Sequence, residues 1–230
     1  MLSGCQDHIK NEISKASFVS VTADETTDVS SISQLVVVFR YVLSNGQPIE
    51  KFWEFTNPLR HDTKSMPKCF QQLKRYVILS PNQVKERSCF ISDYSAVSLL
   101  EAPKFQEYEK TFPTQILDQT TDIYSMLQKD RLKTELRVIY SRSDFKNITG
   151  AISLLQFIIE NSLQTKFPES YKLLLIIVTT PMTTAEAERC FSTLKRVQTF
   201  LRSTMSENRL SALAMLSIEK RMINGISKIQ

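Results

Sequence analysis

The chain has 230 residues, of which 42% are hydrophobic and 23% charged, and this globular composition predicts a packed core and excludes a disordered chain. The chain has 4 glycines, which argues against a glycine-rich phosphate loop. Its longest apolar run, at 173–178, is far shorter than the ~20 residues of a membrane span. Its polar N-terminus shows no secretory signal. The net charge is +5 and most of the excess follows residue 182, which leaves a polyanion as the charged partner to consider. We expect no membrane partner and no small-molecule substrate.

The first part of the chain predicts one helix and then three strands. Residues 6–16 carry isoleucines four positions apart, which is typical of a short amphipathic helix. Residues 18–23 are apolar and β-branched and predict a buried strand that ends at Asp24. Residues 35–42 form the strongest strand pattern in the sequence.

A tight hairpin is expected to join that strand to the next. Asn45 and Gly46 form the pair that favours a type I′ turn, in which both central residues adopt positive φ angles. The return strand is predicted at 49–55 and contains Trp53, the single tryptophan. Two of the three strands should therefore pair in an antiparallel manner.

The pattern changes near residue 104. Before it, residues 64–77 predict a helix, and residues 88–92 predict a short fourth strand that ends at Asp93. After it, residues 105–162 show the spacing of successive amphipathic helices. We therefore expect a mixed α+β fold with a three-stranded antiparallel start and a largely helical C-terminal half.

Two apolar helices are predicted near the end of the chain. Thr183 and Glu186 have the spacing of a capping box, which would start the first helix, and a second helix is predicted from Ser206. Apolar residues follow at helical spacing and form the candidate dimerisation residues: Phe191, Leu194, Val197, Leu201, Leu210, Leu213 and Leu216. Such helices must be covered, either by their own domain or by another chain.

The four cysteines are Cys5, Cys69, Cys89 and Cys190. None of them forms a CxxC pair and the chain has 2 histidines, so the spacing offers no structural zinc site. We expect buried, reduced thiols in a cytosolic or nuclear protein.

The predicted order of strand, hairpin, strand, helix and short strand is that of a ribonuclease-H-like core. In that topology the first and fourth strands are parallel neighbours, so Asp24 and Asp93 at their ends would converge. Paired carboxylates bind Mg²⁺, and two such ions clamp an in-line phosphoryl transfer.

Two motifs resemble the hAT family of transposases. The segment VTADETTDVS at 21–30, with QL at 34–35 and RYV at 40–42, is similar to the opening of the transposase domain in hAT-derived proteins, including zinc-finger MYM-type relatives. The segment TTAEAERCFS at 183–192, with the later KR, LRSTM and RL segments, resembles the hAT C-terminal dimerisation signature. The resemblance implies a truncated core at 1–103, a helical connecting region at 104–170 and a dimerisation region at 171–225.

The resemblance also implies descent from a DDE-type transposase. Asp24, Asp93 and Glu188 would be the three metal-binding acids, and Mg²⁺ would be a cofactor if that site were intact. Each acid also has a structural interpretation: Asp24 could begin a turn, Asp93 could cap a helix, and Glu188 could pair with a nearby cation. Here the glycine that usually follows the second acid is absent.

Two departures from active relatives predict that no enzyme remains. The short stretch between Asp93 and Glu188 leaves no room for the large helical insertion, and no zinc finger of the BED type precedes the core. The hypothesis is a domesticated, catalytically inactive nuclear protein, without a cofactor, that dimerises with itself or with a related hAT-derived protein. The alternatives are a Mg²⁺-dependent transposase or nuclease, and a DNA-binding module that uses Lys195, Arg196, Arg202 and Arg209, which could equally be a solvated helix face.

Overall fold

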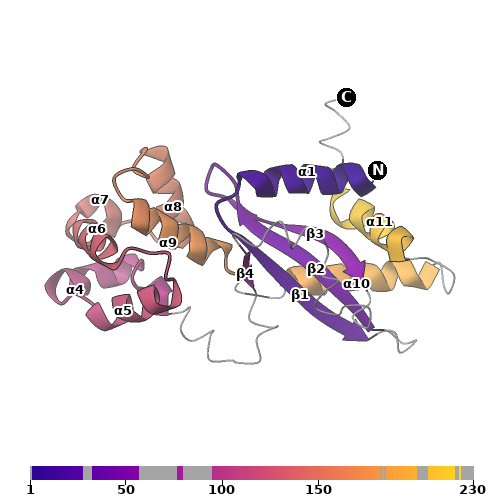
Figure 1. The fold of residues 1–230 in the computed structure, drawn as a ribbon, viewed down its shortest axis with the longest axis horizontal. Helices are drawn as coiled ribbons and strands as arrows, with labels where there is room; N and C mark the ends of the chain where they lie inside the picture. Colours follow the sequence, from indigo (N-terminus) through magenta and orange to yellow (C-terminus); the bar gives the residue numbers. More distant parts are fainter. Residues whose placement is uncertain are drawn as a thin grey trace. The chain divides into compact units, whose positions relative to one another are not determined.

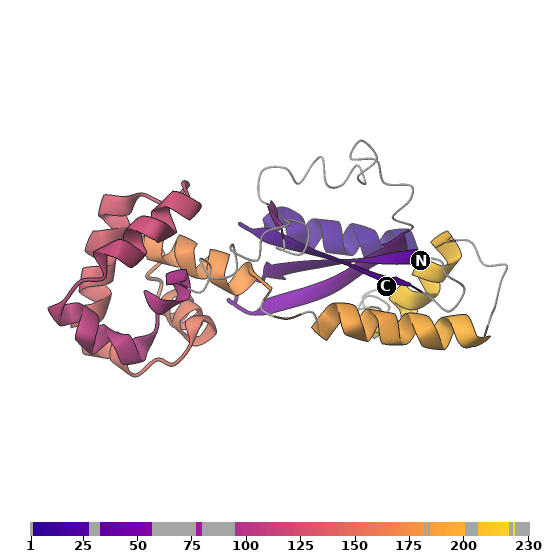
Figure 2. The same ribbon diagram turned by 90° about the horizontal axis from the view of Figure 1, so that it is seen from below.

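In this computed structural model the chain forms two compact units (Figures 1 and 2). The structure describes residues 2–27, 33–56, 77–79, 95–181, 183, 185–220 without 201–206, and 223. Unit 1 comprises Met1–Tyr41, Ile49–Gln83 and Pro181–Gln230, and unit 2 comprises Val42–Pro48 and Val84–Thr180.

Unit 1 is built on a four-stranded sheet in the order β3-β2-β1-β4. The strands are β1 (Val19–Thr27), β2 (Ser33–Val42), β3 (Pro48–Thr56) and β4 (Val77–Leu79). β1 pairs with β2 in an antiparallel ladder and with β4 in a parallel one, in which Val19 faces Val77. The mixed α+β class with its antiparallel start is therefore confirmed.

The parallel neighbour of β1 is not the segment that the sequence predicted. It is Val77–Leu79, whereas the predicted strand at 88–92 lies outside the described residues. The predicted helix at 64–77 is wrong at its last residue, because Val77 begins the apolar run that forms β4. The remainder of that predicted helix is also outside the described part of the chain.

β1 is longer than predicted. It continues past Asp24 to Thr27, which faces Ser33 of β2, because threonines 26 and 27 are β-branched and suit an extended ladder. Asp24 faces Val36 within this ladder and is partly exposed. Asp24 therefore does not begin a turn.

The hairpin between β2 and β3 forms, but its turn differs from the predicted type. The amide N of Gly46 donates to the carbonyl O of Leu43 (2.9 Å), and the amide N of Leu43 donates to the carbonyl O of Gln47 (2.9 Å). Gly46 has φ +82°, whereas Asn45 is not among the described residues with positive φ. The loop is thus three residues long, a type I turn followed by a left-handed glycine, and Asn45 uses its side-chain Oδ1 to accept from the amide of Gln47 (3.1 Å).

Helices cover both faces of the sheet in unit 1. Figure 2 shows α1 (Leu2–Lys15) on one face and α10 (Ala185–Phe200) on the other. On the α1 side, the Tyr41 hydroxyl donates to Oε2 of Glu12 (2.7 Å), and Trp53 packs edge-on against Phe39. α11 (Glu207–Ile218) packs against both α1 and α10.

Unit 2 is helical in its described part. Its elements are η3 (Ala102–Lys104), α4 (Phe105–Lys110), α5 (Thr114–Ile123), α6 (Lys129–Ser141), α7 (Ser143–Lys146), α8 (Ala151–Glu160) and α9 (Pro168–Thr179). None of the helices in the described residues is long and apolar enough to span a membrane.

Two buried carboxylates hold α6 and α9 together by capping each other's helix. Oε2 of Glu135 on α6 accepts from the amide of Ser170 in the first turn of α9 (2.7 Å). In return, Oε2 of Glu169 on α9 accepts from the amide of Gln128 just before α6 (2.9 Å). Each acid thus satisfies an otherwise unpaired amide at a positive helix end, which fixes the packing of unit 2.

Candidate functional site

The C-terminal helix α11 is attached to the outer strand β3 by side-chain hydrogen bonds. Oγ of Ser211 accepts from the amide of Phe55 and donates to the carbonyl O of the same residue, both at 3.1 Å. Oε1 of Glu219 accepts from the amide of Phe52 (3.0 Å). Side chains of α11 therefore satisfy backbone groups that an outer strand otherwise leaves unpaired.

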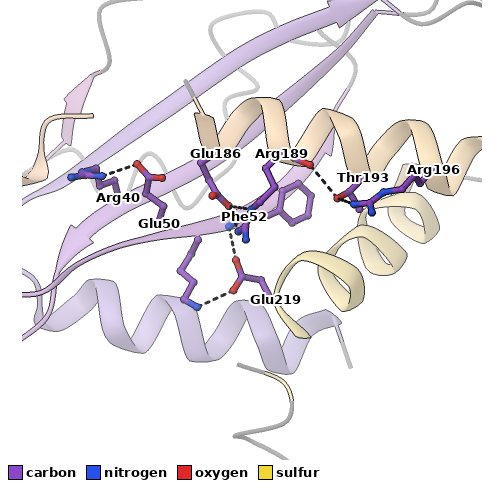
Figure 3. Close-up of polar contacts among 9 residues, drawn as sticks. Arg40, Glu50, Phe52, Glu186, Arg189, Thr193, Arg196 and Glu219 are labelled. Carbon is purple, nitrogen blue, oxygen red and sulfur yellow. Dashed lines mark hydrogen bonds and ion pairs between the residues drawn. The ribbon is translucent and has the colours of Figure 1, made fainter. Parts of the chain in front are cut away.

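Glu219 is also one partner of a buried ion pair. Its Oε2 lies 2.8 Å from Nζ of Lys51, and its side chain is 5% exposed. A buried carboxylate is costly unless it is paired and hydrogen-bonded, and Glu219 has both kinds of partner (Figure 3). Losing either partner would therefore weaken the attachment of α11 to the sheet.

A second cluster of polar side chains lies along α10 (Figure 3). Glu186 pairs with Arg189, and Oγ1 of Thr193 donates to the carbonyl O of Arg189 (3.1 Å) and accepts from Arg196 (3.1 Å). Burial raises the pKa of Glu186, against the opposing effect of Arg189. The Glu186 side chain thus pairs within its own helix, and the capping box predicted for Thr183 and Glu186 stays a prediction.

Cys5 and Cys190 are buried, free thiols, as predicted. Burial raises the pKa of Cys190 to about 12, and the charge of Glu186 contributes in the same direction. Burial also raises the pKa of Cys5. Both thiols therefore stay protonated at neutral pH and are poor nucleophiles. Cys69 and Cys89 lie outside the described residues.

Half of the predicted dimerisation residues that are described are buried within unit 1. Phe191 stacks on Phe55 of β3 with ring centroids 6.4 Å apart, and Leu194 and Leu210 are buried as well. Val197 and Leu213 are partly buried, and Leu201 lies outside the described residues. Much of the apolar surface of these helices is thus buried within unit 1.

One stripe of α11 remains open to solvent. Leu216 is 38% exposed, and Leu213 is partly exposed. Beyond the end of α11 at Ile218, Lys220 is exposed and Ile223 is partly exposed, and the amide of Ile223 donates to the carbonyl O of Glu219 (3.0 Å). The open stripe of α11 therefore consists of Leu213 and Leu216, which lie three positions apart on one side of the helix.

The structure describes two of the three predicted metal-binding acids, so the predicted set stays a prediction. Asp24 lies within β1, Glu188 is exposed on α10, and Asp93 lies outside the described residues. Among the residues that the structure describes, no group of three or more His, Cys, Asp or Glu side chains has the arrangement of a metal site.

The predicted nucleic-acid residues are accessible where they are described. Lys195 and Arg196 are exposed on α10 and Arg209 is exposed on α11, whereas Arg202 lies outside the described residues. The structure thus leaves three of the four cations on the surface of unit 1.

Sequence reasoning missed Ser211 and Glu219, which attach α11 to β3. A usable signal was present, since Ser211, Met215 and Glu219 are spaced four apart and lie on the buried side of α11. A carboxylate on the apolar side of a helix predicts a buried partner. What the sequence does not contain is the identity of that partner, which is 168 positions away for Lys51.

Two family models match the chain. Residues 3–89, which include the four strands and all of α1 except Leu2, match the family described as the ZMYM1/FAM200, RNase-like domain. Residues 135–222, which run from within α6 through α11, match the hAT family C-terminal dimerisation region. No solved structure matches the chain.

Proposed function

Because this chain is a hAT-derived, transposase-like protein, we propose that it works as a non-catalytic module in which two copies associate along the exposed stripe of α11. The observation that carries the proposal is the stripe itself. Leu213 and Leu216 keep access to solvent, although the opposite side of the helix is buried on the chain's own sheet. This helix also lies inside the matched dimerisation region.

The size of the stripe sets the expected affinity. A standard interface buries about 800 Å² on each partner, and a stripe on one short helix is smaller than that. Association must also offset the lost freedom of two molecules, so we expect a dissociation constant in the micromolar range.

A matched pair of substitutions tests the proposed interface. Leu216→Lys places a charge in the stripe and should raise the dimer dissociation constant at least about tenfold, which corresponds to about 1.4 kcal/mol. Ile152→Lys is the control, since Ile152 is 43% exposed on α8 of unit 2. Light scattering across a concentration series gives both values. Equal dimer dissociation constants for the two variants would rule out the stripe as the dimer interface.

The absence of catalysis is supported by the short stretch between Asp93 and Glu188. Positioning supplies much of the rate of phosphoryl transfer, and the insertion that is lost from this stretch would have contributed to it. We expect Mn²⁺ to leave the melting temperature of the wild-type chain unchanged. The melting temperature of Asp24→Asn should likewise not change when Mn²⁺ is added. A metal-induced rise that Asp24→Asn abolishes would instead indicate an intact metal site.

DNA binding through Lys195, Arg196 and Arg209 is a second candidate function, favoured by their exposure on neighbouring helices. Replacing all three with Gln should make the slope of log K for DNA binding against log [salt] less steep. The slope should fall by about 0.9 for each phosphate that the variant no longer neutralises. An unchanged salt dependence would exclude these three cations from the DNA-binding surface.

A further inference from the structure

Unit 2 contains a pair of cations that lie over one aromatic ring. Nζ of Lys133 is 5.7 Å from the ring centroid of Phe112, and Cζ of Arg137 is 5.5 Å from the same centroid. Both cations come from α6, one helical turn apart, and Phe112 lies between α4 and α5. We name Lys133, Arg137 and Phe112 the aromatic cation pair.

The ring holds the two cations in place. Phe112 packs against Tyr140, with ring centroids 6.0 Å apart, and Tyr140 is fully buried and donates its hydroxyl to the carbonyl O of Leu99 (2.9 Å). The ring is thus anchored to the core of unit 2 on one side and attracts the cations through its electron-rich face on another. Long side chains that are already ordered lose less conformational entropy when they bind a ligand.

The charges of the pair are not neutralised by the protein around them. Within the described residues, no carboxylate lies at ion-pair distance from Lys133 or Arg137, and Arg137 is exposed. Like charges four residues apart on a helix repel each other and destabilise the helix. An anion at this position would remove that repulsion.

The neighbouring cations of α6 show the contrast. Nζ of Lys129 lies 2.9 Å from Oδ1 of Asp118, and Nε of Arg131 lies 3.3 Å from Oε1 of Glu135. Those two cations are balanced by acids, whereas the aromatic cation pair is not. One helix therefore carries two balanced cations and two that are available to an external anion.

We propose that the aromatic cation pair binds the phosphate backbone of a nucleic acid. A guanidinium presents a planar fork that matches phosphate geometry, and an ammonium beside it supplies a second charge for a neighbouring phosphate. This site is separate from the exposed cations of α10 and α11 and does not depend on self-association.

The salt dependence of duplex binding tests this site on the full chain. The probe is a fluorescein-labelled 20-base-pair DNA, and anisotropy titrations at several NaCl concentrations give the slope of log K against log [NaCl]. Each neutralised phosphate contributes about 0.9 to that slope, so K133Q/R137Q should reduce it by about 1.8 and each single substitution by about 0.9.

K129Q/R131Q is the matched control, because it removes the same charge from the same helix at cations that already have acidic partners. We expect it to change the slope by less than half as much, with circular dichroism confirming that both double variants keep their helical content. Equal effects of the two double variants, or an undetectable affinity at the lowest salt, would overturn the proposal. Displacement of the DNA by poly-glutamate at equal charge concentration would also overturn it, since the pair would then recognise an acidic peptide.

Discussion

At the scale of single residues, Glu219 connects the C-terminal helix to the sheet. Its carboxylate accepts from the amide of Phe52 on one oxygen and pairs with Lys51 on the other. Ser211, two turns earlier, makes a two-way hydrogen bond with the backbone of Phe55. The polar attachment of α11 to β3 thus depends on two side chains.

Replacing Glu219 should destabilise unit 1 strongly. Glu219→Ala leaves the amide of Phe52 and the charge of Lys51 without their partner, and removing a hydrogen bond to a charged group costs about 1.5–3 kcal/mol. Urea unfolding followed by the fluorescence of Trp53, which is buried in unit 1, measures the change.

The control for Glu219→Ala is the exposed pair of Lys10 and Asp7 on α1. Asp7→Ala should change stability by less than about 1 kcal/mol, because solvent screens an exposed ion pair. If Glu219→Ala lowered the free energy of unfolding as little as Asp7→Ala, the hydrogen bonds that attach α11 to β3 would not stabilise unit 1.

At the scale of elements, the hairpin shows how tertiary packing refines a local pattern. The Asn-Gly pair correctly predicts a turn between two strands, yet the loop has three residues and Gly46 alone adopts a positive φ there. Gly46 also lies close to α8, since a Cβ added to it would stand 3.0 Å from Cδ1 of Ile159. The helix α8, more than 100 positions away, therefore leaves little room for a side chain at Gly46, which a local motif does not reveal.

Gly46→Ala should destabilise the hairpin. A left-handed conformation costs a residue with a side chain about 1–2 kcal/mol, and the new methyl group would also crowd Gln156 and Ile159. Gly4→Ala is the matched control, because nothing lies within 4 Å of its added Cβ and alanine favours the helix α1 by roughly 0.5–1 kcal/mol. Thermal unfolding should therefore shift in opposite directions for the two variants.

Other elements were predictable to different degrees. The positions of β1 to β3 followed from runs of β-branched and apolar residues, although β1 continues past its run to Thr27. β4 was not predicted, since Val77–Leu79 is too short to carry a pattern and is defined by its pairing with β1. The reciprocal caps of Glu135 and Glu169 were likewise invisible, because each reads locally as an ordinary exposed acid.

At the scale of the whole molecule, the two matched families do not correspond to the two compact units. Unit 1 takes α1 and the sheet from the RNase-like match and takes α10 and α11 from the dimerisation match. Unit 2 contains the helices from η3 to α9. The apolar residues of α10 and α11 predicted that these helices are packed against something. The sheet that buries part of them is formed by residues distant in the sequence. The sequence therefore did not show which of these residues belong to the core and which remain for an interface.

This arrangement makes the exposed stripe of α11 dependent on the sheet beneath it. The side of α11 that carries Ser211, Met215 and Glu219 is fixed on unit 1, and the opposite side carries Leu213 and Leu216 outward. Self-association of the folded chain is the central claim that follows.

Sedimentation equilibrium of the full chain tests that claim most directly. Runs between about 1 and 100 µM should fit a reversible monomer–dimer equilibrium with a dissociation constant in the micromolar range. A chain that sediments as a pure monomer at every concentration, up to the highest, would contradict it.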